Sequence, residues 1–120
     1  MLYKNVDVLI DISEDADLGS TRVPLWKGGI LRRMHVTMPL MTGATKGTIT
    51  VENDDGFVFH SKADVDDNTV SDEADLVKPV VPQDNAGADI SGIIVKVQLD
   101  QDATGTDETV VVVLLIEDQA

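Results

Sequence analysis

The sequence predicts an all-β protein, an antiparallel β-sandwich or jelly roll, and three observations lead to this prediction. Six or more short segments alternate apolar and polar residues, the period of two that marks a strand with one buried face. Clusters of Gly, Asp, Asn and Pro separate these segments, and no stretch has a convincing helical pattern. The last thirty residues, Ala88 to Glu117, contain the clearest pair of strands.

In the first strand of that pair, Val95, Val97 and Leu99 alternate with polar residues. The second, residues 110–116, is apolar throughout and rich in β-branched residues, which favours a strand buried on both faces. It is too short to cross a bilayer as a helix. The turn composition around Gly105 predicts that the second strand folds back on the first as a hairpin.

Four earlier strands are expected, at residues 3–12, 30–40, 48–52 and 57–61. The inward positions are predicted to be Val6, Val8, Ile10, Met34, Val36, Met38, Leu40, Ile49 and Val51. Residues 13–21 are predicted to be a loop, and Pro24, Gly28 and Gly29 favour an irregular bend before the second strand. Asp55-Gly56 predicts a tight turn between the last two of these strands.

The span from Ala63 to Ala88 interrupts this regularity and reads as a long acidic excursion. The 120 residues fit a single domain, 1–120, in which residues 1–33 could supply an extended N-terminal arm. There is no cysteine, which excludes disulfides and thiolate chemistry. Because no secretory pattern and no long apolar run occur, we expect a soluble chain with no membrane partner.

The charge is unusually negative, −13 with 17 Asp against 5 Glu. Such a charge opposes nucleic-acid binding, which depends on basic side chains. It fits either a solvated acidic coat or a halophilic or marine source, where salt screens self-repulsion. The charge is also uneven: residues 1–50 sum to +1 and residues 51–120 to −14, which suggests two differently charged surfaces.

One segment has the ligand spacing of a Ca²⁺ loop, with oxygen donors at positions one, three, five, nine and twelve: Asp64, Asp66, Asn68, Asp72 and Asp75. It departs from that pattern at Thr69, where the sharp turn needs Gly, and at Asp75, where Glu is usual. Two interpretations stay open, a Ca²⁺ site and a solvated acidic loop. No other cofactor is expected.

Catalysis is not expected. His35 and His60, the two histidines, fall on the polar faces of predicted strands. The Gly43 to Gly47 segment lacks the Lys-Ser/Thr of a phosphate-binding loop, and carboxylate pairs are uninformative in so acidic a chain.

A partner-binding surface is predicted where the chain is not acidic, at Arg22, Leu25, Trp26, Lys27, Arg32 and Arg33. Trp and Arg are enriched where binding energy concentrates in interfaces. The alternative is that Trp26, the only tryptophan, caps the core.

The layout resembles the decoration or cement proteins that coat the capsids of tailed viruses. The resembling parts are a short N-terminal strand, the segments 29–38 and 47–51, an acidic excursion, and the closing strands 93–99 and 109–116. The resemblance implies a non-enzymatic β-sandwich on the virion surface, often trimeric, bound to the major capsid protein or other virion proteins. The excess of Asp would then point to a virus of a salt-loving or marine host. The rival hypothesis is a Ca²⁺-dependent module that binds carbohydrate or protein.

Overall fold

The computed structural model describes residues 3–24, 29–53, 56–80, 92–104 and 107–118. Strands dominate these residues, and none of them is helical. No membrane-spanning helix is found in this part of the chain. The strands are β1 (Tyr3–Ile12), β2 (Leu18–Pro24), β3 (Gly29–Met38), β4 (Lys46–Glu52), β5 (Val58–Asp66), β6 (Thr69–Glu73), β7 (Lys78–Val80), β8 (Gly92–Leu99) and β9 (Glu108–Asp118).

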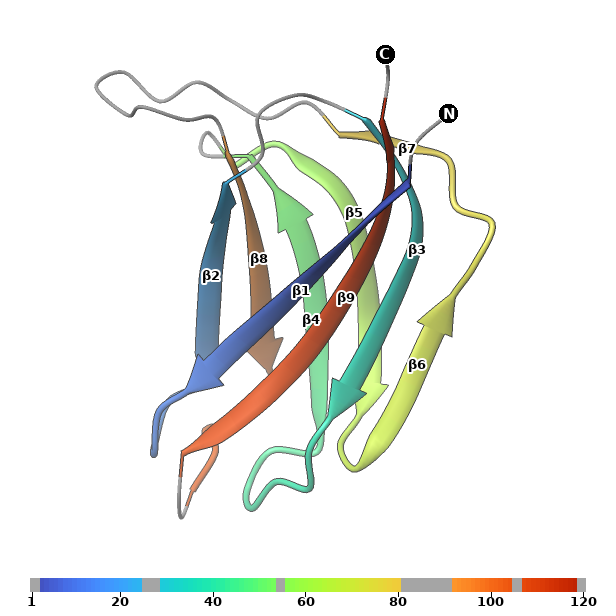
Figure 1. Cartoon of the computed structure of the whole chain (residues 1–120). Coiled ribbons are helices and arrows are strands. Elements are labelled where there is room, and N and C mark those ends of the chain that lie inside the picture. Colours follow the sequence, from blue (N-terminus) through green and yellow to red (C-terminus); the bar gives the residue numbers. More distant parts are fainter. Residues whose placement is uncertain (1–2, 25–28, 54–55, 81–91, 105–106, 119–120) are drawn as a thin grey trace, which may run out of the picture.

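The strands form two antiparallel sheets that pack face to face (Figure 1). Sheet A has the order β1-β9-β3-β6, and β7 also pairs with β3, beside its first residues. Sheet B has the order β2-β8-β4-β5. The predicted all-β, antiparallel sandwich is therefore confirmed.

The pairing is nested along the chain, which identifies the sandwich as a jelly roll. β1 pairs with β9, β2 with β8, β3 with β6 and β4 with β5. The chain thus behaves as one long hairpin that has been rolled up, so that successive nested pairs alternate between sheets A and B. This is the double-sheet, Greek-key arrangement of jelly rolls.

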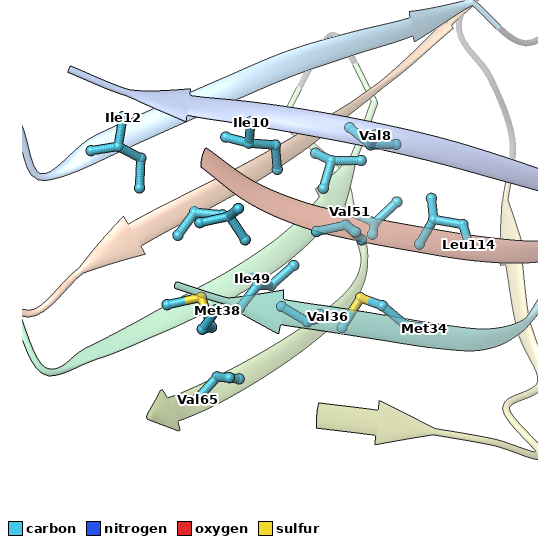
Figure 2. Packing of buried hydrophobic residues seen from close by; sticks show 14 of the residues in the cluster. Val8, Ile10, Ile12, Met34, Val36, Met38, Ile49, Val51, Val65 and Leu114 are labelled. Carbon is cyan, nitrogen blue, oxygen red and sulfur yellow. The ribbon is translucent and has the colours of Figure 1, made fainter. Parts of the chain in front are cut away.

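The core lies between the sheets and is filled by side chains from both (Figure 2). Alternation places Val8, Ile10 and Ile12 of β1 opposite residues of sheet B such as Ile49 and Val51, all essentially inaccessible to water. Each such buried aliphatic side chain contributes roughly 1.5–3 kcal/mol relative to exposure. The inward positions predicted from the alternation are confirmed, except that Leu40 is exposed because it follows the end of β3 and Pro39.

The predicted hairpin of the last two strands is wrong. β8 lies in sheet B between β2 and β4, whereas β9 lies in sheet A between β1 and β3. The connection from Asp100 to Asp107 crosses between sheets, with Ala103 buried and its N–H donating to the carbonyl of Ala16 at 2.8 Å. Turn composition shows that the chain reverses, but it does not show whether the return strand joins the same sheet.

Three other expectations also differ from the structure. The predicted loop 13–21 contains the start of β2, and the excursion 63–88 contains the end of β5, all of β6 and all of β7. The first 33 residues supply β1, β2 and the start of β3, so their described part belongs to the sandwich and not to an extended arm. The predicted turn at Gly56 is confirmed, because β4 and β5 pair on either side of it and the Phe57 N–H donates to Asn53 Oδ1 at 3.0 Å.

Candidate functional site

The two outer faces of the sandwich differ in chemistry. On sheet B the outward residues of the central strands β8 and β4 are mainly polar, and Lys96 pairs with Glu52 at 2.5 Å. On sheet A the central strand β9 points Val111, Val113 and Leu115 outward, each half-buried. An antiparallel sheet with one solvated face normally alternates apolar and polar residues. The apolar outer face of β9 breaks that rule, and such exposed patches mark interaction sites.

A β-bulge in β3 places two consecutive arginines on this outer face. The pairing of β3 with β9 shifts between Leu31 and Arg33. Arg32 Nε then donates to Glu117 Oε2 at 2.7 Å, and Arg33 donates to both carboxylate oxygens of Asp72, at 2.8 and 2.5 Å. Without the extra residue, adjacent side chains of a strand would point to opposite faces.

The two arginine pairs differ in burial. The Glu117 side chain is 4% exposed beneath Arg32, whereas Asp72 is 38% exposed beside Arg33. The hydrogen bond to Glu117 raises the pKa of Arg32, and the bidentate contact with Asp72 raises the pKa of Arg33. The same contact lowers the pKa of Asp72. Both arginines are therefore held in place, with their charges offset by a neighbouring carboxylate.

Two adjoining hollows lie on the outer face of sheet A and share Arg33 and Leu115. The larger, about 560 Å³, is also lined by Tyr3, Arg32, Ala74, Asp75 and Val77. The smaller, about 290 Å³, is also lined by Asn5, His35 and Val113. Tyr3 and Val77 are 58% and 62% exposed, which is high for large apolar groups. Arginine and exposed apolar side chains thus gather at the end of sheet A near β7.

Comparisons with known proteins concern the fold. The structure of infectious bursal disease virus strain Gx matches with 10% identity over 96% of this chain and 32% of that one, with a TM-score of 0.39. A carbohydrate-binding module of the β-sandwich superfamily matches with 12% identity over 92% of this chain and 54% of that one, with a TM-score of 0.34. The virus-like particle of the Macrobrachium rosenbergii extra small virus matches with 10% identity over 100% of this chain and 82% of that one, with a TM-score of 0.27.

Jelly rolls are the fold class of viral capsid and lectin domains. The chain spans about a third of the length of the bursal disease virus protein that it matches. No family model matches the sequence. No curated protein matches it either. The nested strand order establishes the jelly roll independently of these scores.

The described part of the predicted partner-binding surface is split between the two sheets. Leu25, Trp26 and Lys27 lie outside the described residues. Arg22 is exposed on β2, on the outer side of sheet B, where its guanidinium covers Gly92 of β8. Arg32 and Arg33 lie on the outer face of sheet A. The structure therefore brings the last two together but places Arg22 on the opposite face of the sandwich.

The predicted Ca²⁺ ligands lie along two strands, in the turn between them and beyond the second strand, where Asp75 lines the larger hollow. Asp64 and Asp66 belong to β5, Asn68 to the turn, and Asp72 to β6, where it binds Arg33. Alternate residues of a strand are roughly 7 Å apart, whereas Ca²⁺ ligands lie ~2.4 Å from one ion. Among the described residues, no group of three or more acidic, His or Cys side chains is arranged to hold a metal ion.

Of the two histidines, His35 lies on the outer face of its strand as predicted, but His60 does not. His60 faces inward, since it pairs with the buried Val51, and its Nε2 lies 2.8 Å from Glu73 Oε1 of β6. This contact joins the two sheets at their β5–β6 edge and gives the buried imidazole a hydrogen-bond partner. A bulge in β4–β5 changes the register, so the alternation of the sequence misplaced this residue. His35 is half-buried on the outer face of sheet A.

The outer face of β9 was not predicted as a candidate site. Its signal was present in the unbroken apolar run 110–116, which was interpreted as a strand covered on both sides. The structure supplies sheet B as a cover for only one side.

Proposed function

We propose that the chain is a structural protein of a virion, which decorates or cements the capsid shell of a tailed virus with a halophilic or marine host. The observation that carries this proposal is the hollow between Tyr3, Arg32 and Val77, at the β7 end of the outer face of sheet A. Aromatic and Arg side chains dominate binding energy in interfaces. Here Tyr3 is exposed and Arg32 partly exposed at one end of sheet A, on a chain whose net charge is −13.

In this role the protein acts by contact and not by catalysis. The interior of the jelly roll is filled by aliphatic side chains, so work is left to the outer surface. A capsid subunit would bury Tyr3 and Val77 and would approach the Arg32 and Arg33 pairs. The remaining acidic surface would stay hydrated, and its repulsion would keep coated particles apart.

Co-sedimentation with capsid shells tests the proposal. The shells would be assembled from the major capsid protein encoded nearest to this chain, and mass spectrometry of purified particles would establish whether the protein is present in them. Val77→Asp places a charge in the hollow and should reduce shell occupancy at least tenfold. Leu18→Asp adds the same charge at an exposed position of β2 and should leave occupancy unchanged.

Trp26→Ala extends this test to the predicted surface beyond the described residues. Loss of occupancy with Trp26→Ala but not with Val77→Asp would move the contact away from the hollow. Absence of the protein from purified particles would refute the capsid role.

The rival function is a Ca²⁺-dependent carbohydrate- or protein-binding module. Phe57, 64% exposed and 5.5 Å between ring centroids from Phe59, is the aromatic surface that such a module could offer to a sugar ring. A calcium titration and a glycan array separate the two functions. A calcium-induced rise in melting temperature together with a glycan hit lost in Phe57→Ala would favour the rival, since a ligand that binds only the native state stabilises it.

A further inference from the structure

We propose that the outer face of sheet A is a self-association face, on which two copies of the chain pack with β9 against β9 about a twofold axis that runs along this strand. The inference is independent of the capsid role. It rests on the chemistry of three neighbouring strands: β9 is apolar outward, β1 carries Asp7 outward, and β3 carries Arg33 and His35 outward.

The register makes this face complementary to itself. Val113 of β9 pairs with Asp7 on one side and His35 on the other, so these three residues form one row across the sheet. With a twofold axis along β9, β1 of one copy faces β3 of the other, and each row of one copy faces the same row of the other. The opposed residues are Asp7 and His35 in the row of Val113, Asn5 and Arg33 in the row of Leu115, and Leu9 and Thr37 in the row of Val111.

Two polar groups on β3 are suited to these contacts. His35 Nε2 is buried and has no hydrogen-bond partner in the described structure. A buried polar nitrogen without a hydrogen-bond partner is destabilising, so a turn of the ring toward Asp7 of the second copy is favourable. Arg33 uses Nε and one terminal nitrogen on Asp72, and a guanidinium has five N–H donors, which leaves capacity for the amide of Asn5.

The exposed apolar residues fit the same arrangement. Leu9 is 60% exposed and lies in the row of Val111, so the contact would bury it against Thr37 of the second copy, at the edge of the face. Packed sheets lie about 10 Å apart, within reach of opposed side chains. β6 and β7 would remain uncovered, because β1 is the edge strand of sheet A and has no neighbour to oppose them.

The contact should be weak and should depend on salt. The nine named residues form three rows ~6.8 Å apart along three strands ~4.8 Å apart, which makes a face of roughly 20 by 15 Å, or roughly 300 Å² per copy. Interfaces below about 1,200 Å² in total are typically transient. Each copy also carries a charge of −13, and their repulsion is screened within ~3 Å at 1 M salt. Association is therefore best measured in molar NaCl.

Sedimentation equilibrium of the full chain in 1 M NaCl, at roughly 10–500 µM, tests the proposal in the range of a weak interface. We expect a monomer–dimer equilibrium. Val113→Glu should weaken it at least tenfold, because it places two charges on the axis. The control Thr50→Glu adds the same charge at the centre of the outer face of sheet B and should leave the dimer intact. Circular dichroism confirms that each variant remains folded.

Asp7→Ala distinguishes general charge repulsion from a specific contact with His35, because the two predict opposite changes in dimer affinity. The substitution changes the net charge from −13 to −12, so general repulsion alone would strengthen association. Loss of the contact with His35 would instead weaken it several-fold. Asp102→Ala makes the same charge change in the exposed β8–β9 connection and should not weaken the dimer.

Cross-linking tests the position of the axis. The chain has no cysteine, so Val113→Cys introduces a single thiol, which should meet its own copy and be joined by a short bismaleimide. Thr50→Cys should not be joined. A monomer at all concentrations, a trimer, a dimer unaffected by Val113→Glu, or a dimer strengthened by Asp7→Ala would each overturn the proposal. Loss of shell binding by Val113→Glu in a chain that stays monomeric would assign the face to the capsid instead.

Discussion

Truncation of Leu114 and of its neighbour Leu115 should have very different effects, although the change is the same. Leu114 points into the core and is inaccessible to water, whereas Leu115 points outward from sheet A and is half-buried. Leu→Ala in a packed core costs about 2–5 kcal/mol, through lost transfer free energy and the cavity left behind. For the outward leucine we expect a loss of about 1 kcal/mol or less, because water already reaches part of it.

The expected change in melting temperature follows from the size of the chain. Unfolding entropy is about 2.1 cal/mol/K per residue, or about 0.25 kcal/mol/K for this length, so a loss of 3 kcal/mol lowers the melting temperature by about 12 °C. Leu115→Ala should lower it by about 4 °C or less. Urea denaturation at low micromolar concentration, where self-association is negligible, measures the loss of unfolding free energy in each variant. Equal losses, or a larger loss for Leu115, would refute the assignment of the inner and outer faces of β9.

Three further outcomes are expected. Asp100 accepts hydrogen bonds from Thr45 that lower its pKa from 3.8 to about 2. Its carboxylate therefore stabilises the fold above pH 4 and loses this effect as the pH falls to 2. In acid-unfolding curves, the stability difference between wild type and Asp100→Asn should vanish over that interval. Arg32→Ala should lower the melting temperature more than Arg33→Ala, because it leaves the buried Glu117 carboxylate without its partner; equal shifts would contradict the burial of that pair. Gly29→Ala should destabilise by about 1–3 kcal/mol, since its Cβ would lie 2.6 Å from the Glu117 carbonyl oxygen, and an unchanged urea midpoint would show that the two strands separate readily.

The strands themselves were largely predictable from the sequence. The bounds of β1 agree with the predicted segment. β3, β4 and β5 each begin within a few residues of their own predicted start. These predictions succeeded because alternation and turn chemistry act over a few neighbouring residues. β6 and β7 were missed, since their short, charged sequences carry no clear alternation and depend on pairing with β3. β2 was missed as well, because its polar sequence was interpreted as a loop and a bend, and the strand depends on pairing with β8.

The candidate site was predicted only in part. Arg32 and Arg33 were predicted as partner-binding residues from their position in a segment that is not acidic, whereas their ion pairs with Glu117 and Asp72 depend on residues far along the chain. The inward turn of His60 toward Glu73 likewise depends on a bulge and on the neighbouring sheet. Such contacts have no local sequence signature, because the partners are separated by up to 85 residues.

By itself, the sequence determined where the chain is extended, where it turns and which side of most strands is apolar, because these properties depend on local backbone and side-chain preferences. Only the tertiary structure decided which sheet each strand joins, and it separated β8 from β9 although they follow one another. Among the described residues, that choice also left the apolar outer side of β9 without a covering strand. The physical reason is that a sheet is completed by whichever strands satisfy its backbone hydrogen bonds and bury its inner face, and nearness in sequence is only one route to that result.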